Sequence, residues 1–301
     1  MSRAQRIVVA GASSGIGAAL VHALADDGHQ LYACARRGTR LRALAGGRAG
    51  VFVRRCDVSR ERQVMAFAAW VRAQAGRVDA LINCAGAFGA IGPAVETDSR
   101  AWRRTIDTNL YGTYLMIKHL APLMIGPGAR IVNFSGGGAF SPFPNYSAYA
   151  VSKAGVVRLT ETLAVELAPR GITVNAVAPG FVATEIHDAT LRTDPELAGG
   201  TFWARTRQLM DGGDGAVPMD VPVACVRFLL SEAAGALTGK TLSASFDPWG
   251  APAFADAIPE LNASDLYTLR RINPEQLPPE AALRRALMAE PQRAQGAPVR
   301  G

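Results

Sequence analysis

The sequence predicts an α/β fold: a doubly wound parallel sheet of seven strands with helices on both faces, followed by an irregular C-terminal extension. Two observations predict it. Short apolar runs rich in β-branched residues alternate with longer helical patterns along most of the chain, as expected for strands joined by crossover helices. A glycine-rich turn also separates the first apolar run from the first helical pattern. Because parallel neighbours require such crossovers, we expect a single α/β domain.

Seven apolar runs are expected to form the strands, in the order 6–10, 30–35, 51–55, 79–83, 130–135, 172–177 and 240–246. Five helical patterns fill the gaps between them, at 15–27, 60–75, 99–124, 148–167 and 221–231. The apolar runs have the length of buried strands, and the helical patterns repeat their apolar residues at helical spacing. These elements predict one domain over residues 1–248.

Two segments break this alternation. Residues 180–220 are rich in Gly and Asp and show no regular pattern, so we expect an irregular lid over a site. After Phe246, repeated prolines rule out one long helix. We expect residues 249–301 to form an extension that packs on the domain and frays at 292–301.

Composition and charge exclude several classes of protein. The chain has 301 residues, 49% of them hydrophobic, and a formal charge of +7, but its arginines are too scattered to indicate nucleic-acid binding. No apolar stretch reaches the roughly 20 residues of a transmembrane helix, and the apolar run within residues 1–10 is too short for a signal-peptide core. Four separated cysteines lack a metal-binding spacing. We therefore expect a cytoplasmic protein without a metal, a nucleic-acid partner or a membrane span.

The glycine-rich turn is the first candidate for a binding site. It follows the first predicted strand and opens a helix. Glycines let the backbone turn tightly and approach a pyrophosphate, whose charge is met by free amides at the helix N-terminus. Glycine also marks purely structural turns, but this strand, turn and helix favour a dinucleotide site of the Rossmann type. The expected cofactor residues of this turn are Gly11, Ser13, Ser14, Gly15, Ile16 and Gly17.

Two arginines after the second strand bear on the choice of cofactor. NAD-binding Rossmann proteins usually carry an acidic residue there for the ribose 2′-hydroxyl, whereas this chain has Arg36 and Arg37. Guanidinium groups make forked, charge-assisted hydrogen bonds to phosphate oxygens, so the 2′-phosphate of NADP(H) is favoured. The alternative is that both are ordinary surface arginines of the following helix.

Tyr149 and Lys153 form the candidate proton-transfer pair. They begin a predicted helix, and their spacing of four residues puts both side chains on one face. A tyrosine with a pKa of about 10 is a poor acid or base at neutral pH, but a nearby ammonium lowers that pKa by stabilising the phenolate. The pattern alone occurs often by chance, so its weight depends on the other motifs.

Further motifs stand in a fixed order around this pair. They are the glycine-rich turn, Asp57-Val58, Asn83-Cys-Ala-Gly86, Asn109 and Pro179-Gly180. Together with Tyr149 and Lys153 they resemble the short-chain dehydrogenase/reductase family over residues 5–246. Each motif has an ordinary structural alternative, such as a turn former at Asp57, but their joint order favours the family.

The resemblance implies an enzyme that transfers a hydride between NADP(H) and a carbonyl or secondary alcohol. Tyr149 would exchange the proton, Lys153 would hold the nicotinamide ribose and lower the pKa of the tyrosine, and Asn109 would anchor a water in the proton relay. Asp57 and Val58 would flank the adenine. The resemblance also assigns to the cofactor site Asn83, Ala85, Gly86, Asn109, Tyr149, Lys153, Pro179, Gly180, Val182 and Thr184.

One position departs from the family's pattern. The family places a serine thirteen residues before the tyrosine to hold the substrate oxygen, and this chain has Gly136 there. Ser135 is the candidate replacement, with Ser141 or a backbone amide as alternatives. Losing one such donor costs about 2.7–4 kcal/mol, which slows turnover without necessarily abolishing it. The expected catalytic residues are therefore Tyr149, Lys153, Asn109 and Ser135.

The sequence leaves the substrate and the assembly open. The aromatic and basic residues of the predicted lid are Phe181, His187, Phe202, Trp203 and Arg205. Of these, His187 or Arg205 could meet an anionic or sugar-like ligand, although such residues are more often simply solvated. Apolar residues beyond those needed for sheet packing, on helices 99–124 and 148–167, favour a homodimer or homotetramer over a monomer.

Two other functions share these motifs. A cofactor-binding sensor or scaffold could retain the nucleotide site without catalysis, as the missing serine suggests. An epimerase or dehydratase could use a tightly held nicotinamide without net consumption of it. Asn109, Tyr149 and Lys153 favour the oxidoreductase over the sensor, because binding a nucleotide does not require that set.

Overall fold

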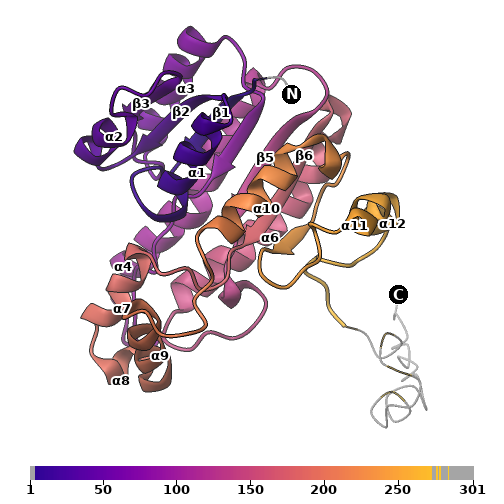
Figure 1. Ribbon diagram of the computed structural model, residues 1–301. Coiled ribbons are helices and arrows are strands. Elements are labelled where there is room, and N and C mark those ends of the chain that lie inside the picture. The colour runs from indigo at the N-terminus through magenta and orange to yellow at the C-terminus, as the bar shows by residue number, and fades with distance from the viewer. Residues whose placement is uncertain (1–3, 273–275, 277, 279–283, 285–301) are drawn as a thin grey trace, which may run out of the picture. The chain divides into compact units, whose positions relative to one another are not determined.

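The computed structural model describes residues 4–272, 276, 278 and 284. Seven strands in this part of the chain form one parallel sheet in the order β3-β2-β1-β4-β5-β6-β7 (Figure 1). They are β1 (Arg6–Ala10), β2 (Gln30–Ala35), β3 (Val51–Arg55), β4 (Ala80–Asn83), β5 (Ala129–Phe134), β6 (Ile172–Ala178) and β7 (Thr241–Ser243). The order changes direction at β1, so the carboxyl ends of β1 and β4 border a crevice. The doubly wound fold is confirmed.

Helices cover both faces of this sheet (Figure 1). The first face carries α1 (Gly15–Asp26), α2 (Gly38–Ala45) and α10 (Asp220–Leu230). The second face carries α3 (Glu61–Ala75), α5 (Gly112–Leu120) and α6 (Ser147–Leu167). Alternate residues of a strand point to opposite faces, so Val9 of β1 packs in the first core and Val8 in the second.

The helix predicted over residues 99–124 is interrupted. α4 (Ser99–Ile106) passes through a π-helical turn (Asp107–Tyr111) into α5, and a 3-10 turn (Ala121–Leu123) follows. Pro122 lacks the N–H that a continuing helix would need. A π turn inside a helix frequently marks a functional site, and Asn109 lies in this one.

The expectation of an irregular segment at 180–220 is wrong, because much of it is helical. The helices there are α7 (Asp188–Arg192), α8 (Pro195–Ala198) and α9 (Gly200–Met210), with a 3-10 turn at Glu185–His187. Asp194 caps α8 by accepting a hydrogen bond from the Glu196 N–H at 2.8 Å, and Pro195 occupies the first helical position. Both are ordinary helix-start signals. We call residues 180–220 the lid.

β7 is shorter than the strand predicted at 240–246. The Ser243 N–H donates to the Asp247 carboxylate at 2.6 Å, and the Asp247 N–H donates back to the Ser243 carbonyl at 3.2 Å. These bonds close a turn directly after the strand. Phe246 is 89% exposed as a result.

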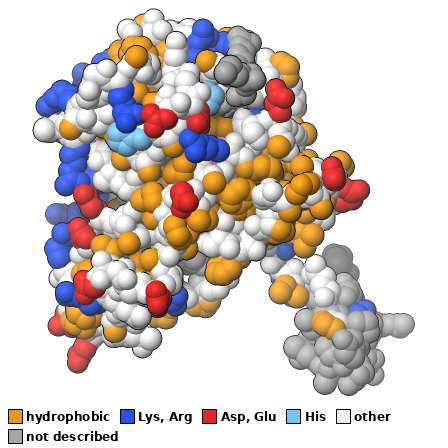
Figure 2. Space-filling view, viewed as in Figure 1, with side chains coloured by type: hydrophobic (Ala, Val, Ile, Leu, Met, Phe, Trp, Pro, Cys, Tyr) orange, Lys and Arg blue, Asp and Glu red, His pale blue; other side chains and the backbone are white. Residues whose placement is uncertain are grey.

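Two short helices, α11 (Pro252–Asp256) and α12 (Ile258–Ala263), follow this turn and pack against the first core. Trp249 also packs there, with its ring centroid 5.9 Å from that of Phe228 on α10. Figure 2 shows hydrophobic side chains gathered over α10 on this face. The chain divides into two compact units after Thr268. The domain boundary after residue 248 stays a prediction, and the fraying predicted at 292–301 lies outside the described residues.

Within the described residues, every helix is too short or too polar to cross a bilayer. The same residues contain no group of three or more His, Cys, Asp or Glu side chains placed to hold a metal ion. The four cysteines are free thiols.

Candidate active site

A cavity of about 800 Å³ lies at the carboxyl edge of the sheet. Its walls come from the glycine-rich turn after β1, the ends of β2 and β5, the loop after β4, the start of α6 and the lid. The volume is within the range of about 300–1,000 Å³ typical of ligand sites. The crevice beside β1 and β4 is also where a doubly wound sheet binds its ligand.

The glycine-rich turn has no room for side chains at two positions. Gly11 has φ +85°, and a Cβ there would lie 2.5 Å from the Ala85 backbone nitrogen. A Cβ at Gly17 would lie 2.4 Å from the Gly11 carbonyl oxygen. Glycine alone accepts the left-handed backbone at Gly11 and the close contact at both positions. The turn therefore packs directly on the loop after β4 and on α1, which fits the close approach that a bound pyrophosphate requires.

Arg37 connects this turn to the lid. Its guanidinium donates to the Ser13 Oγ at 3.1 Å and to the Ser14 Oγ, and it forms an ion pair with Glu185 at 2.6 Å. Arg40 pairs with the same carboxylate. These hydrogen bonds, with Arg37 contributing most, hold the pKa of Glu185 below its ordinary value. Figure 2 shows Lys and Arg side chains along the edge where α2 lies.

Tyr149 and Lys153 lie one turn apart at the start of α6, and both border the cavity. The Lys153 Nζ donates to the Phe134 carbonyl at 2.7 Å and lies 5.7 Å from the centroid of the Tyr149 ring. The two residues are 8% and 5% exposed. Burial raises the pKa of Tyr149 and lowers the pKa of Lys153 to about 8. At pH 7 most Lys153 side chains therefore still carry their charge beside the tyrosine.

Asn109 is fully buried and ties the loop after β4 to α6. Its Oδ1 accepts from the Ala87 N–H, and its Nδ2 donates to the Ala87 carbonyl, both at 2.9 Å. The same Nδ2 donates to the Ser152 Oγ at 3.0 Å, and Ser152 donates to the Tyr149 carbonyl at 2.7 Å. The amide thus fixes the first turn of α6 against the loop.

Most of the predicted site residues border the one cavity. They are Gly11, Ser13, Ser14, Gly15, Ile16, Gly17, Arg36, Arg37, Val58, Ala85, Gly86, Ser135, Tyr149, Lys153, Pro179, Gly180, Val182 and Thr184. Three others are not among the residues that line it. Asn109 holds the loop, Asn83 donates to the Asn133 Oδ1 at 2.9 Å, and the Asp57 carboxylate accepts from the Ser59 N–H and Oγ.

Gly136, where the family's pattern has a serine, lies against the Tyr149 hydroxyl. A Cβ at Gly136 would lie 2.3 Å from the Tyr149 Oη and 3.1 Å from its Cζ. The tyrosine oxygen therefore occupies the space that a serine side chain would need. The Oγ of the preceding Ser135 is buried and finds no hydrogen-bond partner among the described residues.

An aromatic wall beside Tyr149 was not predicted. The Phe88 ring centroid lies 4.7 Å from that of Tyr149, and Phe143 lies 4.9 Å from Phe202 of the lid. These rings form one apolar cluster with Tyr146. The sequence signals for this wall are the position of Phe88, two residues after the predicted Asn83–Gly86 motif, and the aromatic Phe202 in the predicted lid.

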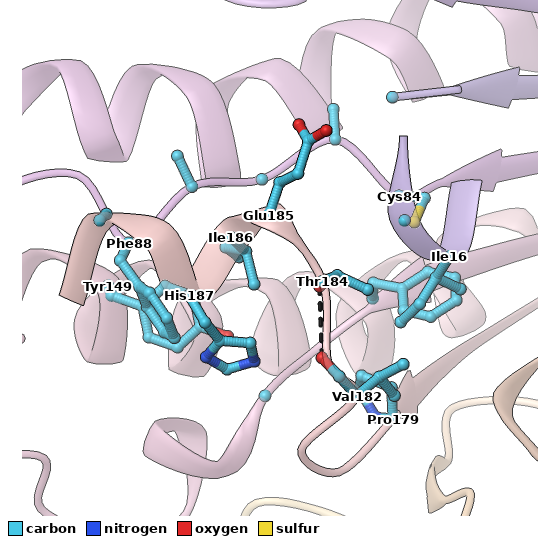
Figure 3. A pocket seen from close by; sticks show the side chains of 18 of the residues that line it. Ile16, Cys84, Phe88, Tyr149, Pro179, Val182, Thr184, Glu185, Ile186 and His187 are labelled. Atoms are coloured by element: carbon cyan, nitrogen blue, oxygen red, sulfur yellow. Dashed lines mark hydrogen bonds between the residues drawn. The ribbon is translucent and has the colours of Figure 1, made fainter. Parts of the chain in front are cut away.

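Not all of the lid residues named from the sequence border the cavity. Phe181, His187, Phe202 and Arg205 border the cavity, whereas Trp203 is not among the residues that line it. Figure 3 shows His187 beside Phe88 and Tyr149, while Glu185 points away from them. The Phe88 ring centroid is 5.4 Å from that of His187. The cavity thus has a polar, arginine-bordered end and an aromatic end.

A glycine-rich turn at the crevice of a doubly wound sheet defines the class of dinucleotide-binding α/β proteins. The family model for short chain dehydrogenases matches residues 5–195. D-threitol dehydrogenase of Mycolicibacterium smegmatis is 35% identical over 243 residues, 78% of this chain and 89% of that protein. 3beta-hydroxysteroid dehydrogenase 1 of Eggerthella lenta is 37% identical over 251 residues, 80% of this chain and 92% of that protein.

A solved structure agrees with these relatives. A variant of actinorhodin polyketide ketoreductase with NADPH has a TM-score of 0.69 and 29% identity, covering 81% of this chain and 97% of that one. The chain belongs to the short-chain dehydrogenase/reductase family. This family comprises oxidoreductases that use a nicotinamide cofactor and act on small molecules.

Proposed function

We propose that this protein transfers a hydride between NADP(H) and a carbonyl or secondary alcohol, with Tyr149 as the acid–base residue and Lys153 as its partner. The observation that carries the proposal is their position: both side chains border the cavity that also contains the glycine-rich turn. The nicotinamide, when bound, supplies or accepts the hydride. The protein supplies orientation and the proton.

Each proposed role follows from the local contacts. Tyr149 gives its phenolic proton to the substrate oxygen during reduction and takes a proton back during oxidation. Burial alone makes it a weak acid, so a nearby cation is required to favour the phenolate. Lys153 supplies that charge at 5.7 Å from the ring. Asn109 positions the first turn of α6 through Ser152.

The arginine end of the cavity supports NADP(H) over NAD(H). Arg37 and Arg40 already bind a carboxylate, that of Glu185, beside Ser13 and Ser14. Such a cluster of donors would also suit phosphate oxygens. Arg36 borders the same cavity, and no ion pair of its side chain is found within the described part of the chain. We assign the 2′-phosphate to Arg36 and Arg37, and the pyrophosphate to the glycine-rich turn.

Arg36→Ala and Arg37→Ala should each raise the Kd for NADPH by about 10–100-fold, because a hydrogen bond to a charged group contributes about 1.5–3 kcal/mol. The Kd for NADH should stay within about threefold. Fluorescence titration with both nucleotides measures this difference without turnover. Arg62→Ala, an exposed arginine on α3, is the control. An unchanged preference between NADPH and NADH in both variants would contradict the assignment.

The aromatic end supports a substrate whose carbonyl stands on an apolar, ring-bearing body. Phe88, Phe143 and Phe202 form this wall next to Tyr149. Apolar and aromatic surfaces gain by burying ring-bearing ligands, whereas hydroxyl groups of a polyol would lose their hydrogen bonds to water there. The relatives do not decide this point, since one is named for D-threitol and another for a hydroxysteroid.

A substrate panel tests the function. Cyclic and aryl ketones are compared with open-chain sugars, and NADPH consumption is followed by absorbance. We expect kcat/KM at least about tenfold higher for the apolar ketones, since each buried methylene contributes about 0.8 kcal/mol. Binding of NADPH without any turnover would favour the sensor, and substrate conversion without net NADPH consumption would favour the epimerase. A preference for sugars would overturn the assigned substrate class.

A further inference from the structure

Gly136 stands where the family has a serine, and the preceding residue, Ser135, lies on the side of the strand away from the Tyr149 hydroxyl. Ser135 continues β5, donating its N–H to the Val177 carbonyl at 2.9 Å. Successive residues of an extended strand point to opposite sides, and a side chain at 136 would meet the Tyr149 hydroxyl. Ser135 therefore shares the side of Asn133, whose amide donates to Thr160 in the middle of α6 at 2.9 Å. A different group has to hold the substrate oxygen next to Tyr149.

His187 is the polar side chain at the aromatic end of the cavity that best meets this need. It is 6% exposed, borders the cavity, and its Nδ1 has no hydrogen-bond partner among the described residues. Its ring stacks on Phe181, with centroids 3.8 Å apart, and lies 5.4 Å from Phe88. Phe88 in turn lies 4.7 Å from Tyr149. His187 and Tyr149 thus flank the same phenylalanine ring (Figure 3).

A buried polar atom without a partner is costly, and at the wall of a cavity a ligand can complete it. The aromatic stacking holds the His187 ring in place, which is the support that a hydrogen-bond donor in an active site requires. We propose that His187 holds the substrate oxygen in place of the missing serine. The inference rests on the proposed function, because it assigns a role within the same hydride-transfer site.

The protonation state suits that role. Burial lowers the pKa of His187 to about 4, with the Val182 carbonyl and Asp188 opposing the shift. The ring is therefore neutral at pH 7 and carries one N–H. The Val182 backbone accepts a hydrogen bond from this ring, and a neutral imidazole has only one N–H to give. Holding a carbonyl oxygen therefore requires the tautomer with the proton on Nδ1, which gives up the Val182 hydrogen bond for one to the substrate, and no charge is added next to Tyr149. The proton that the substrate receives still comes from Tyr149.

The test compares His187→Phe with His187→Asn, using 1-tetralone as the ketone and NADPH as the cofactor. Phenylalanine keeps a ring for stacking on Phe181 but removes both nitrogens, so kcat should fall by about 100-fold, the lower end of the effect of losing one such donor. KM and the Kd for NADPH should change by less than about threefold. Asparagine retains an N–H donor, so the kcat of His187→Asn should be at least about tenfold higher than that of His187→Phe.

Two readouts separate this role from a structural one. The free energy of unfolding of His187→Phe should differ from that of the wild type by no more than about 1 kcal/mol, because the loss of the hydrogen bond to the Val182 backbone is offset by removal of an unpartnered buried atom. The infrared carbonyl band of 1-tetralone bound with NADP⁺ should move to higher frequency in His187→Phe, because one hydrogen bond to the oxygen is lost. An unchanged band with unchanged kcat would overturn the inference, as would a large loss in Ser135→Ala alone.

The outcomes also distinguish this inference from the proposed function. If Tyr149→Phe abolishes turnover but His187→Phe does not, the hydride-transfer function stands and the role of His187 is wrong. If the wild type neither turns over nor binds 1-tetralone or the other ketones, the proposed function fails and the role of His187 fails with it.

Discussion

Tyr149→Phe should lower kcat by about 10²–10⁴-fold, the range expected when a general acid is removed. The change deletes one oxygen and keeps the ring that packs 4.7 Å from Phe88. The Kd for NADPH should therefore stay within about threefold. Stopped-flow measurement of NADPH oxidation with the best ketone of the panel, together with fluorescence titration of NADPH, separates the two effects.

Tyr146→Phe is the matched control for this prediction. Tyr146 is fully buried three residues earlier, and its hydroxyl donates to the Thr190 Oγ1 at 3.0 Å. Removing that bond should destabilise the protein by about 1 kcal/mol and change kcat only a few-fold. Equal rates for the wild type and Tyr149→Phe would exclude Tyr149 as the acid–base residue.

Gly136→Ser should lower kcat by about 100-fold, although it restores the residue that the family's pattern has at this position. The new Cβ would lie 2.3 Å from the Tyr149 Oη, so the tyrosine must move. A displacement of about 1 Å can cost about 10²-fold in rate. Steady-state kinetics on the same ketone measures the loss, and NADPH titration checks that the cofactor site is intact.

The adjacent glycine provides the control. A Cβ at Gly137 meets nothing within 4 Å, so Gly137→Ser should change kcat by a few-fold at most even though this residue also borders the cavity. Full activity in Gly136→Ser would show that the tyrosine hydroxyl does not need the position it has here. If Gly136→Ser loses activity and the double variant Gly136→Ser/Tyr149→Phe regains it, that result would count equally against the assignment of Tyr149.

The sheet could be predicted because its strands differ from their surroundings in composition. β1, β2 and β3 have the predicted bounds, since each is an apolar run between turn residues. β7 ends early because Asp247 binds the Ser243 N–H and closes a turn, and no periodicity signals that bond. The motif residues of the turn and of α6 meet at one cavity because parallel strands bring their carboxyl ends to one edge.

The short helices could not be predicted from apolar spacing. α2 buries only Leu41 and Leu44, so its amphipathic pattern is brief, and its clearest signal is the left-handed Gly46 after it. The lid helices are similarly short, although Asp194 and Pro195 do mark a helix start. The aromatic wall combines Phe88, Phe143 and Phe202, which are far apart in sequence, so only tertiary packing reveals it.

The hydrogen bonds of Asn109 have a consequence for how this scaffold can change. The buried Asn109 amide forms hydrogen bonds with Ala87, 22 residues earlier in the chain, and with Ser152, 43 residues later. It therefore fixes the backbone next to Tyr149 from inside the core. The lid borders the same cavity but makes none of these hydrogen bonds. Substitutions in α9, which borders the cavity through Phe202 and Arg205, can therefore reshape the cavity while the first turn of α6, with Tyr149, keeps its position.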